Sequence, residues 1–170
     1  MTYEERFIEH LVGLVHAGDR AALARLRRGA GRRPGESVDA LREVVPHLPP
    51  DPWKHDGYFL VAGLFGLHPL HTNAQQNLGG VFRQFGEHES NEKRFRALLN
   101  SHEDELGGHL IRAMALARAK EIPVNFRLLL EDVLHWTHAD RFVQIRWASS
   151  FWHAVSETFE AQEKSAEQAQ

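Results

Sequence analysis

The sequence predicts an all-α protein, and three observations support this prediction. Apolar residues recur at spacings of three and four over most of the 170-residue chain, which is the period of a helix face packed on a core. No stretch alternates between polar and apolar residues over the length of a strand. The stretch 125–159 holds three of the four tryptophans, so we expect the densest part of the core there. We predict a compact helical bundle of about eight or nine helices in two small subdomains.

The first half of the chain is expected to form four helices, at residues 3–17, 20–28, 37–45 and 58–67. Gly18 ends the first helix and Asp19 caps the second, since glycine favours helix C-termini and aspartate favours N-caps. Residues 29–35 contain three glycines, a proline and two arginines, which predicts a flexible basic loop. Asp51 and Pro52 supply an N-cap and a first-turn proline for the fourth helix.

The second half is expected to form helices over residues 81–85, 90–99, 101–120, 125–136 and 140–159. Ser101 with Asp104, and Thr137 with Asp140, have the spacing of capping boxes with aspartate in place of glutamate. We therefore expect helices to begin at these two places. The last two helices form a hairpin against which the earlier helices pack.

We expect the chain to divide near residue 100. Residues 1–100 would form an N-terminal helical subdomain that contains the basic loop 29–35, residues 101–160 a C-terminal helical subdomain, and residues 161–170 an acidic tail. Residues 20–42 hold seven arginines against two acidic residues, a local net charge of +5, whereas residues 157–170 carry a net charge of −3. The basic region could therefore meet an anion, although the whole chain has a formal charge of −3.

The composition excludes several classes of protein. With no cysteine, the chain has no disulfide scaffold, no cysteine zinc site and no thiol nucleophile. Its first residues contain no apolar run of signal-peptide length, and no stretch approaches 18 apolar residues. We expect a cytoplasmic protein that has no membrane partner.

The motifs of common enzymes are missing or incomplete. His88-Glu89 and His102-Glu103 lack the second histidine of a zinc protease motif. Asp132 and His135 resemble half of a di-iron site, but the facing segments are apolar. Neither a glycine-rich phosphate loop nor a Gly-x-Ser-x-Gly turn is present. We expect a protein that is not an enzyme and has no cofactor, bound metal or small-molecule substrate.

Arginine provides the best candidates for function. The chain has 16 arginines and 4 lysines, a bias that suits bidentate phosphate contacts and that genomic base composition can also produce. Guanidinium groups spread over a helical surface can follow a phosphate backbone without reading the bases. The candidate nucleic-acid-binding residues are Arg27, Arg28, Arg32, Arg33, Arg94, Arg112, Arg141 and Arg146. For any one of them, a solvated position or an intramolecular carboxylate pair is the alternative.

Four stretches in this order resemble one known family. They are Ala-Arg-Leu-Arg-Arg at 24–28, the apolar segment 60–69 ending in His-Pro, the segment 77–99 around Asn-Leu-Gly and Arg-Phe, and the segment 129–152 around two tryptophans. These stretches look like the motifs of the CasB proteins, the small subunits of the type I-E CRISPR surveillance complex called Cascade. The resemblance covers most of residues 4–152.

This resemblance implies a non-catalytic helical subunit of two subdomains, present as two copies beside other Cascade subunits in antiviral defence. Family members contact the guide RNA (crRNA) and the target DNA, and they hold the displaced DNA strand of the R-loop through basic surface residues. Arg27 and Arg28 fall on the Arg-Arg of the first motif. By the same resemblance, Arg94 falls in the basic part of the third stretch, Arg112 on the arginine of the helix that follows it, and Arg141 in the basic turn of the last stretch.

Two alternatives remain open at the level of sequence. His55-Asp56 is the dipeptide of the HD-type metal-dependent phosphohydrolases, which are also helical, but the composition alone nearly supplies such a pair by chance. A purely structural helical adaptor, whose arginines pair with protein carboxylates, is the second alternative.

Overall fold

The computed structural model describes residues 1–153 and 164–169, and it confirms the all-α prediction. Within these residues there are nine α-helices of seven or more residues and no strand. The helices are α1 (Tyr3–His16), α2 (Arg20–Gly29), α3 (Val38–Val44), α4 (His55–Leu67), α5 (Leu78–Gln84), α6 (Glu89–Leu99), α7 (Glu103–Ala119), α8 (Phe126–Leu134) and α9 (Phe142–Ala148). Short 3-10 turns, Val45–His47 and Pro52–Lys54, precede α4, and a π-helical turn, Ser149–His153, continues α9.

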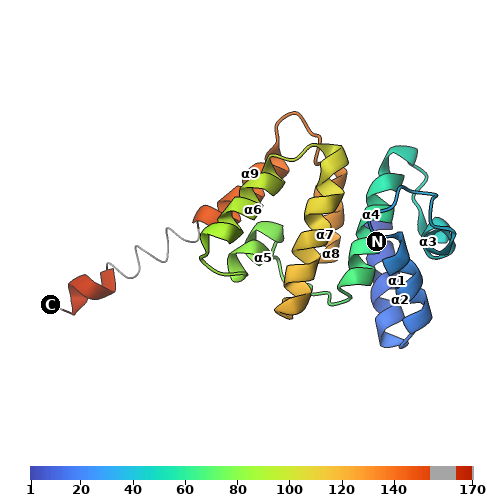
Figure 1. Ribbon diagram of the computed structural model, residues 1–170, viewed down its shortest axis with the longest axis horizontal. Coiled ribbons are helices and arrows are strands. Elements are labelled where there is room, and N and C mark those ends of the chain that lie inside the picture. Colours follow the sequence, from blue (N-terminus) through green and yellow to red (C-terminus); the bar gives the residue numbers. More distant parts are fainter. Residues whose placement is uncertain (154–163, 170) are drawn as a thin grey trace.

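The helices are arranged around a central pair. Figure 1 shows α7 and α8 in the middle of the molecule, α1 to α4 on one side of them, and α5, α6 and α9 on the other. Helix α4 contacts α2, α7 and α8, while α5 contacts α9 and the π-helical turn. Helices α5 and α6 thus pack with elements that follow them in the chain. The division of the chain at residue 100 stays a prediction.

Helix α4 is buried because it is apolar on nearly all sides. Tyr58, Val61, Leu64 and Phe65 are all 0% exposed, as expected for a helix that has no polar face. Two of its glycines allow α2 to cross closely. A Cβ atom on Gly66 would lie 2.5 Å from the backbone nitrogen of Arg27 and one on Gly63 would lie 2.9 Å from the Cα of Ala30, so neither position has room for a side chain.

The predicted aromatic core of the last two helices is present in its described part. Trp147 is 0% and Trp136 is 3% exposed, and their rings lie 5.0 Å apart between centroids. Trp152 is 37% exposed and packs 5.4 Å from the ring of Phe95. The predicted continuation of this helix to Phe159 lies outside the described residues.

One predicted helix cap is confirmed, and two predicted capping boxes are wrong. Asp19 caps α2 by accepting a hydrogen bond from the Ala22 N–H at 3.0 Å, and Gly18 has the left-handed φ of 66° expected after a helix. The predicted capping box at Ser101 is wrong. Its hydroxyl donates to the Leu98 carbonyl at 2.7 Å and so closes α6, while α7 begins two residues later.

The capping box predicted at Thr137 is also wrong, because α9 begins only at Phe142. Arg141, at the N-cap position, has a left-handed φ of 53°, and this residue redirects the chain into α9. The Asp140 N–H instead donates to His138 Nδ1 at 3.2 Å within the turn. No helix among the described residues has both the length and the apolar character needed to cross a membrane.

Candidate nucleic-acid interface

Arg27 and Arg28 lie on the exposed side of α2 because Ala22 and Leu26 bury its other side. Arg28 donates to Asp39 of α3 at 2.9 Å, and both side chains are about half exposed at 59% and 48%. Arg27 makes no ion pair within the described residues. The two neighbouring arginines therefore differ, since Arg27 is free to meet an anion and Arg28 already has a carboxylate partner.

The basic loop 29–35 forms turns that present Arg32 and Arg33 to solvent. The Arg33 backbone N–H donates to the Glu36 carboxylate at 3.1 Å, and Gly31 has a left-handed φ of 77°. A Cβ atom on Gly31 would lie 3.3 Å from Cδ1 of Ile111 in α7. The loop thus lies against α7 beside Ile111, the residue before Arg112.

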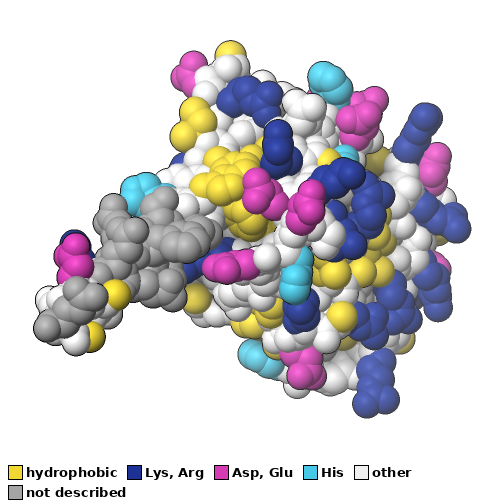
Figure 2. Space-filling model, turned by 60° about the vertical axis from the view of Figure 1, so that its left-hand side comes forward, with side chains coloured by type: hydrophobic (Ala, Val, Ile, Leu, Met, Phe, Trp, Pro, Cys, Tyr) yellow, Lys and Arg dark blue, Asp and Glu magenta, His cyan; other side chains and the backbone are white. Residues whose placement is uncertain are grey.

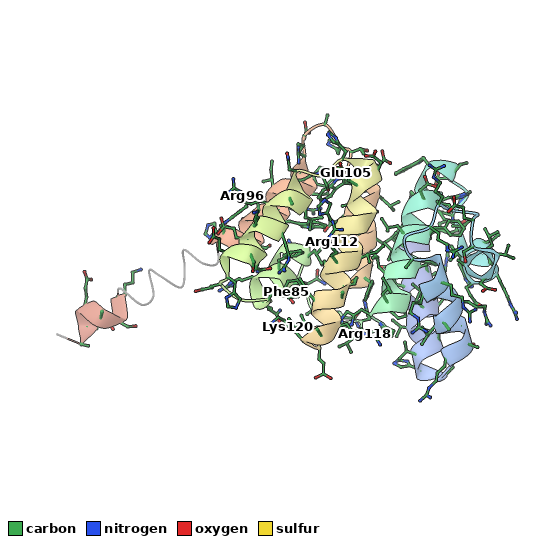
Figure 3. The ribbon with its side chains drawn as sticks, in the orientation of Figure 1. Phe85, Arg96, Glu105, Arg112, Arg118 and Lys120 are labelled. Atoms are coloured by element: carbon green, nitrogen blue, oxygen red, sulfur yellow. The ribbon has the colours of Figure 1, made fainter. Side chains whose placement is uncertain are left out.

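Arg94 and Arg112 line one groove of about 390 Å³ between α6 and α7. Arg112 Nη2 lies 3.2 Å from His109 Nδ1, and burial together with the charge of Arg112 lowers the pKa of His109. Figure 3 places Arg112 on the side of α7 that faces α6. Neither Arg94 nor Arg112 forms an ion pair with a described carboxylate. The sequence predicted both residues but not that they would share a groove.

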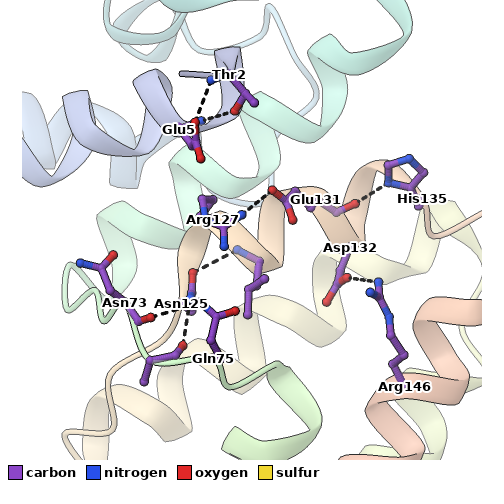
Figure 4. Close-up of polar contacts among 12 residues, drawn as sticks. Thr2, Glu5, Asn73, Gln75, Asn125, Arg127, Glu131, Asp132, His135 and Arg146 are labelled. Atoms are coloured by element: carbon purple, nitrogen blue, oxygen red, sulfur yellow. Dashed lines mark hydrogen bonds and ion pairs between the residues drawn. The ribbon is translucent and has the colours of Figure 1, made fainter.

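Arg146 is paired in the structure. Its Nη2 lies 2.9 Å from Oδ1 of Asp132, as Figure 4 shows, and the indole N–H of Trp147 donates to the other carboxylate oxygen at 2.7 Å. Asp132 is only 6% exposed in its side chain, so burial raises its pKa even though Trp147 and Arg146 oppose that shift. This arginine neutralises a buried carboxylate.

Arg141 also has a partner, since its Nη2 donates to the Leu99 carbonyl at 2.5 Å. It lies with Arg96 at a second pocket, which shares only Ala97 with the groove that Arg94 lines. Five of the eight predicted residues therefore remain without a side-chain carboxylate or carbonyl partner in the described part of the chain: Arg27, Arg32, Arg33, Arg94 and Arg112. We call these five residues the free arginine set.

Further cations accompany the free arginine set. Lys93 lines the groove with Arg94, and Arg118 of α7 donates to the Leu67 carbonyl at the end of α4, at 3.4 Å. Neither residue is among the candidates predicted from the sequence. The position of Lys93 beside Arg94 could have indicated it. In Figure 2, Lys and Arg side chains gather on the half of the visible face away from the C-terminal end, with hydrophobic side chains exposed among them.

A different groove, of about 970 Å³, lies where α4, α7 and α8 meet. Asp56, Glu103 and Asp104 line it, and Trp53 beside them is 61% exposed. Three carboxylates with no arginine or lysine in the lining repel phosphate. This side of the molecule is therefore unsuited to a nucleic-acid backbone.

The His55-Asp56 dipeptide begins α4. The Nε2 atom of His55 lies 2.8 Å from the carbonyl of Pro49, so this ring holds the preceding turn. In residues 1–153 and 164–169 no group of three or more His, Asp and Glu side chains is arranged to hold a metal ion.

Residues 22–152 match the family described as CRISPR-associated protein Cse2. The Cse2 protein of Thermus thermophilus is 31% identical over 159 residues, which cover 91% of this chain and 92% of that protein. The crystal structure of CasB from Thermus thermophilus has a TM-score of 0.79 at 31% identity, covering 90% of this chain and 99% of the other. A chain of a CRISPR RNA-guided surveillance complex, 24% identical, has the same fold with a TM-score of 0.79 over 95% and 97% of the two chains.

Proposed function

The chain belongs to the Cse2 family of CRISPR-associated proteins, a non-catalytic family, and we therefore propose that it is the small subunit of a type I-E Cascade surveillance complex. In this role it binds the sugar-phosphate backbone of crRNA, target DNA and the displaced strand without reading sequence. Binding the displaced strand stabilises the R-loop, since the strand is then less available to re-pair with the target. It would do so in the cytoplasm as part of antiviral defence.

The observation that carries this proposal is the free arginine set. Arginines that lack a protein carboxylate keep their full charge for an external anion, and guanidinium groups bind phosphate in a bidentate manner. The loop with Arg32 and Arg33 lies against α7 next to Arg112, and Arg112 shares a groove with Arg94. This series of contacts supports a path for the backbone from the loop to α6.

Protein partners would occupy other surfaces. The solved surveillance complex that holds a chain of this fold supports assembly with other Cascade subunits. As the family resemblance implies, two copies of the chain would be present in the complex. The acidic groove at Asp56, Glu103 and Asp104 is a surface for a protein rather than for nucleic acid. Trp53 is largely exposed beside it, and tryptophan is one of the residue types enriched among the energetically dominant residues of protein interfaces.

A structural adaptor is the second candidate, and one observation favours it. Arg25, Arg28 and Arg146 pair with Glu43, Asp39 and Asp132 respectively, so several arginines already serve the fold. An adaptor would need no arginine that is free of carboxylates. The free arginine set therefore favours the nucleic-acid-binding proposal over the adaptor.

The test is a titration of the purified protein with unrelated single-stranded DNA, double-stranded DNA and RNA over a range of salt concentrations. We expect binding in the micromolar range that ignores sequence and weakens steeply with salt, because released counterions dominate backbone binding. Absence of binding at low salt would contradict the proposal for this subunit and support the adaptor. Preference for one sequence would contradict backbone binding.

A further inference from the structure

The groove between α6 and α7 has an apolar floor in addition to its two arginines. Its floor is apolar, formed by Phe82, Leu98, Ala113 and Leu116, and the first three of these are at most 2% exposed. The groove is open because Ala97 of α6 and Ala113 of α7 face it with side chains too small to fill the space between the helices. At about 390 Å³ its volume is within the range of roughly 300–1,000 Å³ found for small-molecule sites.

The rim of this groove is cationic and polar. Lys93 and Arg94 line it from α6, and His109 and Arg112 line it from α7. No carboxylate lines the groove, and none of the three cations has a described ion-pair partner. Because the Arg112 guanidinium can only donate, its contact makes His109 Nδ1 an acceptor, which leaves Nε2–H free to donate.

We propose that this groove binds one unstacked nucleobase, while the cations of its rim hold phosphates of the same strand. This inference rests on the proposed function. A base has flat faces of low polarity and is joined through its sugar to a phosphate anion, and an apolar floor inside a cationic rim matches those two parts. Single-strand binding proteins combine the same features, a positive groove along the backbone and faces on which bases stack. The loop of Arg32 and Arg33 lies against α7 at Ile111, the residue before Arg112, so the strand that supplies the base can continue along the basic loop.

The test compares two single strands of equal length, oligodeoxythymidine and the same backbone made abasic, which carry the same number of phosphates. We expect the wild-type protein to bind the intact strand about tenfold more tightly, which lies within the factor of roughly 5–150 expected for one stacked base. The salt dependence should be equal for the two strands, because the phosphate contacts are the same.

Ala97→Leu supplies the decisive variant. Ala97 is exposed and both residues favour helices, so the fold should be retained. The added side chain narrows the groove, and the neighbouring pocket of Arg141 that Ala97 also lines, without changing the charge of either. We expect this variant to bind intact DNA as weakly as abasic DNA, with unchanged affinity for the abasic strand. The matched control is Ala21→Leu, an exposed alanine of α2 outside the groove, which should keep the tenfold preference.

Each other outcome would overturn the inference. Equal affinity of the wild-type protein for both strands would leave the proposed function intact and assign the groove to phosphate contacts alone. Binding of polyglutamate that Ala97→Leu weakens, with no such effect on DNA, would assign the groove to an acidic peptide. Failure of both strands to bind at low salt would overturn this inference together with the proposed function.

Discussion

At the residue scale, the most informative side chain is Asp132, which is buried between a tryptophan and an arginine. Its two oxygens accept from Trp147 at 2.7 Å and from Arg146 at 2.9 Å. Burial still raises its pKa, so the folded protein binds this proton more tightly than the unfolded chain does. The stability linked to Asp132 is therefore greatest in acid and decreases as the pH rises through its raised pKa.

Arg146→Ala should test this network. With Asp132 ionised, the variant loses the ion pair and should be less stable than the wild type by about 1 kcal/mol, a modest figure because Arg146 is 58% exposed. With Asp132 protonated there is no ion pair to lose, so the difference should shrink as the pH falls. Urea denaturation over a pH series measures it. Arg96→Ala, an exposed arginine without a described carboxylate partner, is the control, and a similar pH trend there would contradict the assignment to Asp132.

At the element scale, two close helix contacts position the candidate interface. Gly66 lets the backbone of Arg27 approach α4, and Gly79 lets α5 approach α9, where an added Cβ would meet the backbone of Trp147. Backbone atoms cannot move aside as the end of a flexible side chain can. The position of Arg27 relative to the rest of the free arginine set therefore depends on a glycine in another helix.

Gly66→Ala should separate α2 from α4 and destabilise the protein by about 1–3 kcal/mol, the usual cost of overpacking. Gly13→Ala is the matched control, because that helical glycine has nothing within 4 Å of an added Cβ. Alanine there should stabilise the protein by about 0.4–1 kcal/mol, since it restricts the unfolded chain and favours helix. Chemical denaturation measures the change in the free energy of unfolding of each variant. Equal changes in the two variants would contradict the close contact of Gly66 with α2.

At the scale of the whole molecule, positive and negative side chains gather on different faces. The free arginine set lies on α2, the basic loop, α6 and α7, while an acidic groove lies where α4, α7 and α8 meet. A net charge of −3 for the chain conceals this separation. The proposed nucleic-acid and protein partners would therefore bind different faces of the subunit.

Replacing both Arg32 and Arg33 with alanine should weaken binding to unrelated single strands equally. The slope of log affinity against log salt should decrease by about 1.4, or roughly 0.7 for each phosphate that is no longer neutralised. The control with the same charge change is Arg28→Ala with Arg127→Ala, since these arginines pair with Asp39 and Glu131. A slope that changes equally in both double variants would mean that net charge, not the basic loop, determines binding.

The helical class, the approximate positions of the helices and the family could all be predicted from the order of residues along the chain. Apolar spacing of three and four is local information, and so is the Asp19 cap, which joins residues three positions apart. The capping boxes at Ser101 and Thr137 failed because the same side-chain pattern fits more than one local turn, and packing selected another.

Whether an arginine is free to bind an external anion, in contrast, depends on how the helices pack. Arg28 meets Asp39 and Arg146 meets Asp132, pairs that are 11 and 14 residues apart and lie on different helices. The groove of Arg94 and Arg112 likewise exists only because α6 and α7 lie beside each other in the fold. A charge pattern in the sequence cannot separate paired from unpaired arginines, because the Coulomb energy depends on distances in space that the fold alone determines.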